Sequence, residues 1–272
     1  MSEQRSTEPL NLALCIWYPH EMRSLSIPRS IVPGQRVLLL SPTSTAAAPT
    51  AAPPINLLYL AAALERAGAD VRAVDMGSVR GLVDRDTLRN AVRDFQPTLV
   101  GVTLFTETAL AAYEDLAEAG LAPDVITVAG GPHATAAPKE ALAHGFHAVA
   151  IGEGEETVVA LSAAVARREP LSTVSGLWIH GPDGVPTFTG GRAQIPELDT
   201  IANPLAAFDT FPRHWYRGPD EGGGMPAMLL TSRGCPSRCT FCANVAYGRS
   251  YRFHSLERVI AEMEEWHARE GT

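Results

Sequence analysis

The sequence lacks three features that would each indicate a different class of protein. No run of roughly eighteen consecutive apolar residues is present, so no membrane-spanning helix is expected. No block of basic residues is present, and the formal net charge of −8 argues against nucleic acid as a partner. The first residues do not follow the basic-then-apolar order of a secretory signal. We therefore expect a cytoplasmic protein with no membrane and no nucleic acid among its partners.

Cysteine is also scarce, and its placement is informative. The chain has 4 cysteines in 272 residues, and three of them, Cys235, Cys239 and Cys242, lie in one short run. Clustered cysteines without a secretory signal favour metal binding over disulfides. Three thiolates on one loop suit an iron–sulfur cluster; zinc is the alternative, although no second cysteine pair is present to complete a common zinc site. The fourth, Cys15, is expected to be a small buried hydrophobe.

Between residues 36 and 168, short apolar runs alternate with segments of helical periodicity. This alternation predicts a parallel, doubly wound sheet with helices on both faces, in which ligands bind beyond the carboxyl ends of the strands. The expected strands are Val37–Leu40, Val71–Asp75, Leu99–Thr103, Val125–Ala129 and Ala148–Ile151. The expected helices are Asn56–Ala67, Asp84–Phe95, Thr108–Ala119, Lys139–Ala143 and Glu155–Arg167.

The pattern changes after residue 168. Residues 175–189 predict a small hairpin, and residues 190–224, which are rich in proline and glycine, predict a linker. An apolar segment, Met225–Thr231, is predicted to be a strand that leads through a turn at 232–234 into the cysteines. Ser255 is expected to cap an amphipathic helix over Leu256–Arg269. The expected apolar face of that helix consists of Leu256, Val259, Ile260, Met263 and Trp266.

Four stretches in this order carry a resemblance to a known family. They are Pro53-Pro-Ile-Asn-Leu-Leu-Tyr-Leu-Ala-Ala-Ala-Leu-Glu65, Val128-Ala-Gly-Gly-Pro-His-Ala-Thr135, Ile151-Gly-Glu-Gly-Glu-Glu-Thr157 and the C-x3-C-x2-C run. Together they resemble the cobalamin (B12)-binding radical S-adenosylmethionine (SAM) proteins. The resemblance implies a Rossmann-like B12-binding domain, followed by the first βα unit of a radical SAM partial (β/α) barrel. The domain boundaries expected on this basis are 1–35 for an N-terminal segment, 36–170 for the B12-binding domain, 171–224 for hairpin and linker, and 225–272 for the start of the radical SAM domain.

The resemblance also implies two sets of cofactor contacts. In the first set, Cys235, Cys239 and Cys242 hold a [4Fe-4S] cluster whose fourth iron is open to SAM. Phe241 is placed near the SAM adenine, with simple loop packing as the alternative. The second set contacts cobalamin and contains Thr103, Phe105, Gly130, Gly131 and His133.

Two features of the B12 half leave alternatives open. A glycine pair suits close backbone approach to a ligand, but Gly130 and Gly131 also suit a simple turn. Many B12 proteins carry D-x-H-x-x-G after the first strand, whereas residues 41–54 here contain no histidine. His133 is not at the equivalent position, so a polar contact at the cofactor periphery is expected of it instead of cobalt ligation.

The acidic run after the fifth strand has two interpretations. Glu153, Glu155 and Glu156 either orient a loop over the cofactor or are acids favoured at a helix N-terminus. We favour the second interpretation for Glu155 and Glu156.

The function implied by the resemblance is methyl transfer to an unactivated carbon or phosphorus of a small molecule through a 5′-deoxyadenosyl radical. A flavodoxin- or ferredoxin-type protein is implied as the reducing partner. The alternatives are a B12-dependent radical SAM cyclisation or rearrangement, a non-catalytic corrinoid-binding module, and a zinc-bearing structural protein. Since only about thirty residues follow Cys242 and a barrel needs roughly 150–200 more, we expect a truncated chain or one half of a split enzyme, with little or no turnover by itself.

Overall fold

The computed structural model describes residues 34–44, 51–78, 83–216, 225–242, 244 and 246–271. The expectations for Cys15 and for residues 1–33 lie outside the described residues. The same holds for the middle of the loop after the first strand, residues 45–50.

The core of the molecule is a seven-stranded sheet in the order β2-β1-β3-β4-β5-β6-β7. The first five strands pair in parallel and are buried in the interior, with every residue of β3 buried. Strand order reverses between β1 and β3, which is where doubly wound sheets bind ligands. These strands confirm the predicted ones to within two residues. They are β1 (Arg36–Ser41), β2 (Asp70–Asp75), β3 (Leu99–Thr103), β4 (Ile126–Gly130) and β5 (Ala148–Ala150).

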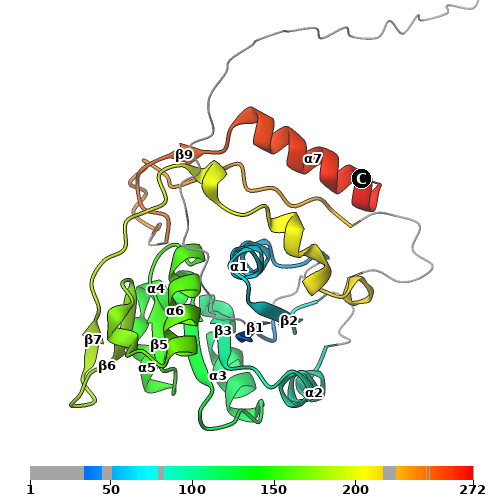
Figure 1. The fold of residues 1–272 in the computed structure, drawn as a ribbon. Helices are drawn as coiled ribbons and strands as arrows, with labels where there is room; N and C mark the ends of the chain where they lie inside the picture. The colour runs from blue at the N-terminus through cyan, green and yellow to red at the C-terminus, as the bar shows by residue number, and fades with distance from the viewer. Residues whose placement is uncertain are drawn as a thin grey trace, which may run out of the picture.

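Helices cover both faces of this sheet, as predicted (Figure 1). Helix α1 (Ile55–Arg66) contacts α6 (Glu155–Arg167), while α2 (Arg85–Phe95) contacts α3 (Ala109–Glu118). An Asp84–Thr87 capping box fixes the start of α2. Helix α4 (Pro132–Ala136) begins directly after the glycine pair and precedes α5 (Pro138–Ala143). Proline at the first helical position favours that start.

The predicted hairpin forms and extends the sheet of the first domain. Its strands are β6 (Leu177–His180) and β7 (Pro186–Phe188). Strand β6 pairs antiparallel with β5, and β7 pairs antiparallel with β6. The sheet is therefore mostly parallel, with an antiparallel edge that covers β5.

The prediction of a linker over 190–224 is wrong for its described part. Three short 3₁₀ helices, Leu198–Thr200, Pro204–Thr210 and Arg213–Trp215, pack this segment onto the molecule, the second of them against α1. Its apolar side chains are buried, because they recur at a spacing of about three residues that suits 3₁₀ turns. They are Leu205, Phe208, Phe211 and Trp215. The prolines that suggested a linker instead start and end these turns.

The strand predicted over Met225–Thr231 is also wrong. The strand is β8 (Ser232–Arg233), placed where a turn was expected, and it pairs antiparallel with β9 (Arg252–Phe253). A strand forms only where its backbone pairs with a neighbouring strand. Among the described residues, that pairing here covers only Ser232–Arg233 with Arg252–Phe253.

Helix α7 (Leu256–Glu270) forms with Ser255 as its N-cap, as predicted. Its predicted apolar face is wrong for Leu256, Ile260 and Met263, which are 69%, 44% and 53% exposed, and is confirmed for Trp266, which is buried. The buried side of α7 carries Glu262, Trp266 and Glu270.

Ion pairs explain why the acids of α7 are buried. Arg258 Nε lies 2.6 Å from Glu262 Oε1, and Arg213 pairs with Glu270. The hydropathy pattern of the sequence does not reveal the buried side of α7, because two of its buried residues are acids that arginines neutralise.

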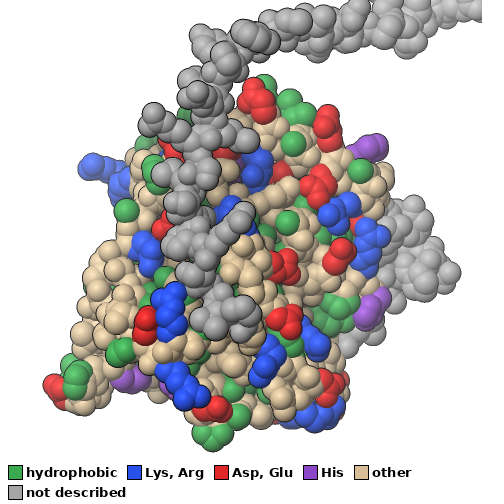
Figure 2. Space-filling model, in the orientation of Figure 1, with side chains coloured by type: hydrophobic (Ala, Val, Ile, Leu, Met, Phe, Trp, Pro, Cys, Tyr) green, Lys and Arg blue, Asp and Glu red, His purple; other side chains and the backbone are tan. Residues whose placement is uncertain are grey.

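Two further observations concern the surface. Within the described ranges, none of the helices is both long and apolar enough to cross a bilayer. On the face drawn in Figure 2, acidic and basic side chains are interspersed.

We predict that Trp266 anchors α7. Its ring is 1% exposed, lies edge-on to Phe208 at 5.1 Å and donates a hydrogen bond to the Met228 carbonyl at 3.2 Å. Trp266→Ala should lower the free energy of unfolding by about 3–5 kcal/mol in denaturant titrations, because it leaves a cavity. Met263→Ala, on the exposed side of α7, is the control and should cost less than about 0.5 kcal/mol. Equal losses would show that Trp266 does not anchor the helix.

Candidate functional site

A cavity of about 260 Å³ opens at the carboxyl ends of the central strands. Leu39, Gly101 and Val128, from β1, β3 and β4, form its floor. Leu60 of α1 and Leu161 of α6 contribute to its walls. The cavity therefore lies at the reversal of strand order and extends between the sheet and two helices, which is where a doubly wound fold takes a ligand.

Glycines allow the backbone to approach closely around this cavity. A Cβ at Gly101 would lie 3.1 Å from Leu39 Cδ2, and one at Gly154 would lie 2.9 Å from Leu60 Cδ2. Gly131 has φ of +98°, and a Cβ there would lie 2.9 Å from the Leu104 carbonyl oxygen. A Cβ at Gly130 would meet no described atom within 4 Å, so this position faces open space. Gly131 thus provides the positive φ that the turn requires, and Gly130 leaves the cavity wall open beside it.

Four of the five residues predicted to contact cobalamin line the cavity: Thr103, Phe105, Gly130 and Gly131. The Thr103 hydroxyl accepts a hydrogen bond from Asn56 Nδ2 at 3.0 Å. His133 is not among the lining residues. Its Nδ1 lies 3.2 Å from Thr106 Oγ1, and its Nε2 lies 3.4 Å from Glu140 Oε1. Cofactor contact by any of the five stays a prediction.

Three buried polar atoms at the cavity have no hydrogen-bond partner among the described residues. They are the Tyr59 hydroxyl, Glu155 Oε2 and Arg233 Nε, and all three residues line the cavity. Burial raises the pKa of Tyr59, so its hydroxyl stays protonated and able to donate. An apolar slot with a donor and an acceptor at its wall fits a ligand that carries amide groups, such as the corrin periphery. These residues therefore fit cobalamin.

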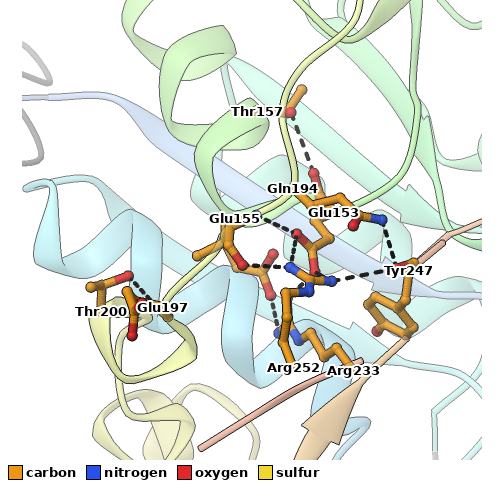
Figure 3. Close-up of polar contacts among 10 residues, drawn as sticks. Glu153, Glu155, Thr157, Gln194, Glu197, Thr200, Arg233, Tyr247 and Arg252 are labelled. Carbon is orange, nitrogen blue, oxygen red and sulfur yellow. Dashed lines mark hydrogen bonds and ion pairs between the residues drawn. The ribbon is translucent and has the colours of Figure 1, made fainter. Parts of the chain in front are cut away.

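An ion-pair network lies beside the cavity (Figure 3). The Glu153 carboxylate binds Arg252 in a bidentate manner, at 3.0 Å and 2.8 Å, and also accepts the Ile195 backbone N–H at 2.8 Å. Arg233 lies 3.4 Å from Glu153 and 2.5 Å from Glu155. We call the four side chains Glu153, Glu155, Arg233 and Arg252 the clamp. Each is at most 9% exposed.

The charges of the clamp hold Glu153 ionised. Burial acts to raise the pKa of Glu153, but hydrogen bonds from Arg252 and Ile195 and the charge of Arg233 outweigh it, and the pKa is lowered. Burial acts to lower the pKa of Arg233, but Glu155 outweighs it and the pKa is raised. Glu155 and Glu156 both lie in the first turn of α6, as expected for acids at a helix N-terminus. Glu155 is in addition buried and paired with Arg233, whereas Glu156 is exposed and lies 3.5 Å from Arg192.

The cysteine loop follows directly from β8. Cys235, Cys239 and Cys242 are free and exposed. The Cys235 N–H donates to the Gly248 carbonyl at 3.2 Å, and the Asn244 amide donates to the Cys235 carbonyl at 3.0 Å. Gly234 has φ of +85°, and a Cβ there would overlap the Ser250 carbonyl oxygen.

Among the described His, Cys, Asp and Glu side chains, no three are gathered closely enough to hold a metal ion. The three thiols are thus not drawn together in this structure, and the fit of the loop to an iron–sulfur cluster rests on the chemistry of its donors, three free thiols on one short segment. Phe241 is 90% exposed on this loop, and its contact with SAM stays a prediction.

The cysteine loop and the cavity are neighbours. Arg233, Ala246 and Tyr247 line the cavity together with the B12-half residues, and a Cβ at Gly152 would lie 3.5 Å from the Ala246 carbonyl. The structure thus brings the two predicted sites into one region.

Sequence reasoning missed several residues of this region. Gly101 has a readable signal, since a glycine in the middle of an apolar strand indicates close approach of another group. Tyr59 and Arg252 have none, because their partners lie on segments far away in sequence.

The comparisons with known proteins agree with this geometry. Residues 43–162 match the family model for the B12 binding domain. The chain is 32% identical over 243 residues to an uncharacterized methyltransferase of Pyrococcus horikoshii, covering 86% of this chain and 51% of the relative. It is 29% identical over 219 residues to an anaerobic magnesium-protoporphyrin IX monomethyl ester cyclase of Rubrivivax gelatinosus, covering 78% of this chain and 38% of the relative.

A solved structure shares the fold. It is the radical S-adenosylmethionine methyltransferase TsrM from Kitasatospora setae, with cobalamin and a [4Fe-4S] cluster bound. The TM-score is 0.67 at 23% identity, over 86% of this chain and 46% of that one. The chain therefore spans about half the length, or less, of the proteins it matches.

The glycine pair offers a matched test of backbone strain. Gly131→Ala should lower the free energy of unfolding by about 1–3 kcal/mol, because alanine disfavours the positive φ and its Cβ meets the Leu104 carbonyl. Gly130→Ala should change it by less than about 1 kcal/mol, because its Cβ faces open space. Thermal or denaturant unfolding of the two variants measures the difference, and a larger loss for Gly130→Ala would contradict the geometry.

The lowered pKa of Glu153 predicts a pH dependence. A carboxylate whose pKa in the folded state is below its ordinary 4.5 stabilises the fold above that pH and loses this contribution as the pH falls through the folded value. Wild type should exceed Glu153→Gln in unfolding free energy by about 1–3 kcal/mol at neutral pH. The gap should close on acidification below pH 4.5. A gap that is constant from pH 7 to pH 3 would contradict the assignment; Glu156→Gln is the control and should show almost none.

Proposed function

We propose, from the premise that this chain belongs to the cobalamin-binding radical SAM proteins, that it carries the cofactor sites of an enzyme that methylates a small molecule. The observation that carries the proposal is that residues flanking the cysteine loop also line the cavity. A cysteine loop with three free thiols borders a glycine-lined cavity at the switch point of a B12 binding domain. The chemistry needs its two cofactors close together, and this region of the chain offers a site for each.

Each residue has a role in this proposal. Cys235, Cys239 and Cys242 hold the [4Fe-4S] cluster, and Phe241 packs against the adenine of SAM. Thr103, Phe105, Gly130 and Gly131 contact cobalamin, and His133 makes a polar contact at its periphery. When bound, the cluster with SAM supplies a one-electron reduction and a radical, and cobalamin supplies a transferable methyl group.

The chain's own residues bind and orient these groups. The open position at Gly130 leaves room beside the sheet, where a side chain would otherwise enter the slot. Leu39, Val128 and Leu161 exclude water from it, and the Tyr59 hydroxyl offers a buried hydrogen bond that favours one orientation of the ligand. A flavodoxin- or ferredoxin-type protein is proposed as the reductant.

The methylated atom is proposed to be an unactivated carbon or phosphorus. The methyltransferase names of the relative from Pyrococcus horikoshii and of TsrM support methyl transfer. A second candidate is a cyclisation that uses the same cofactors without methyl transfer, and the similarity to the cyclase of Rubrivivax gelatinosus favours it.

Anaerobic reconstitution with iron, sulfide and hydroxocobalamin tests the two sites separately. We expect wild type to take up about four iron, about four sulfide and about one cobalamin per chain. The triple variant Cys235→Ala, Cys239→Ala, Cys242→Ala should lose iron and sulfide and keep cobalamin. Gly130→Val should weaken cobalamin binding by at least about tenfold, because its side chain enters the cavity, and should keep iron.

The other outcomes are equally informative. Cobalamin without iron and sulfide in the wild-type chain would support a corrinoid-binding module and overturn the enzyme proposal. Zinc alone would support a structural metal protein. Uptake of neither cofactor would overturn both sites.

A further inference from the structure

The clamp joins three segments that are far apart in sequence. Glu155 is the first residue of α6 and Glu153 lies two residues before it, Arg233 lies in β8 directly before Gly234 and Cys235, and Arg252 lies in β9. The charges cancel, with two acids against two guanidinium groups. The clamp therefore connects the B12 binding domain to both sides of the cysteine loop.

Burial makes this arrangement informative. The four side chains are between 1% and 9% exposed, and charges buried to this degree are costly unless they are paired. Apolar side chains of similar volume would stabilise a plain interface about as well. The ion pairs add a defined geometry, because a bidentate carboxylate–guanidinium pair fixes both the distance and the relative orientation of its two side chains.

Arg233 lies between the two candidate cofactor sites. Its guanidinium carbon is 5.1 Å from the centre of the Tyr59 ring and 5.3 Å from the centre of the Tyr247 ring. Both rings line the cavity, while the next two residues of the chain lead to the first cysteine. Any displacement of Arg233 therefore moves the cavity wall and the cysteine loop together.

The cysteine loop has few other supports. The β8–β9 ladder pairs two residues with two, and the three cysteines are exposed. The Gln194 amide donates to the Tyr247 carbonyl at 2.6 Å, and the Cys235 N–H donates to Gly248. The clamp contributes the charged contacts that reach from this loop to the sheet domain.

We propose that Glu153 and Glu155 are positioning residues, which hold the cysteine loop at a fixed distance and direction from the cobalamin cavity by binding Arg252 and Arg233. The function of the clamp rests on the proposed function, since it sets the relation between the two cofactors. Its physical basis can be tested without either of them.

Amide hydrogen exchange of the cofactor-free 272-residue chain is the first test. The reporters are the N–H groups of Cys235 and His254, which donate to Gly248 and Thr231 at 3.2 Å and 2.9 Å. Glu153→Gln should speed their exchange by at least about tenfold, because one uncompensated guanidinium remains buried. The amides of β1 and β3, which open with the whole fold, should speed by no more than the loss of global unfolding free energy allows, and by less than the reporters.

Glu156→Gln is the matched control, because Glu156 lies in the same acidic run and is exposed. It should leave both reporters within about twofold of wild type. Equal rates at the Cys235 and His254 amides in Glu153→Gln and Glu156→Gln would overturn the proposal.

If Glu153→Gln does not fold, Arg252→Lys replaces it. Arg252→Lys keeps the charge and loses the bidentate geometry, so it should raise the exchange of both reporters by a smaller factor. Wild-type rates in Arg252→Lys would overturn the proposal as well.

The second test separates positioning from stability. In chain loaded with both cofactors, the electron spin relaxation of cob(II)alamin reports its distance from the reduced cluster. Glu153→Gln should bind both cofactors yet show a broadened or weakened spin interaction, whereas Glu156→Gln should match wild type. An unchanged interaction in Glu153→Gln would overturn the positioning role. Failure of wild type to bind either cofactor would instead overturn the proposed function and leave the exchange result to stand by itself.

Discussion

The pairing of Glu153 with Arg252 and Arg233 is the interaction on which the arrangement of the site depends. It lies where the fifth parallel strand leads into α6, and its partners arrive from the two strands that flank the cysteine loop. Without these contacts, a doubly wound sheet and a short exposed loop would share one chain with little to relate them. With them, the cysteine loop becomes part of the cavity wall.

The shape of the cavity depends on glycines at several positions of the backbone around it. At Gly101, Gly131 and Gly154 the backbone passes so close to its neighbours that a single added carbon would meet Leu39, the Leu104 carbonyl or Leu60. Large aliphatic residues fill the rest of the sheet interior, and Gly101 is the position in β3 without a side chain where the strand lines the cavity. The chain thereby combines a densely packed core with one slot of defined shape.

The sequence predicted the sheet well and the connections poorly, for physical reasons. Buried parallel strands read as short apolar runs, so β1 and β3 were visible directly. The segment through Phe208 and Phe211 was misread because prolines mark 3₁₀ turns as readily as linkers. The buried side of α7 was hidden because Glu262 and Glu270 are neutralised by arginines from elsewhere. The clamp was hidden for the same reason, since Glu153 meets Arg252 only after the chain has folded.

Gly234 has a consequence for anyone who would transplant the cysteine motif into another scaffold. The oxygen of Ser250 occupies the space that any larger residue at Gly234 would need, and the Gln194 amide likewise crowds Gly248. The eight residues from Cys235 to Cys242 are therefore not a self-sufficient module. A functional graft would have to carry the chain from Gly234 through Ser250 as one piece, together with a counterpart for Gln194.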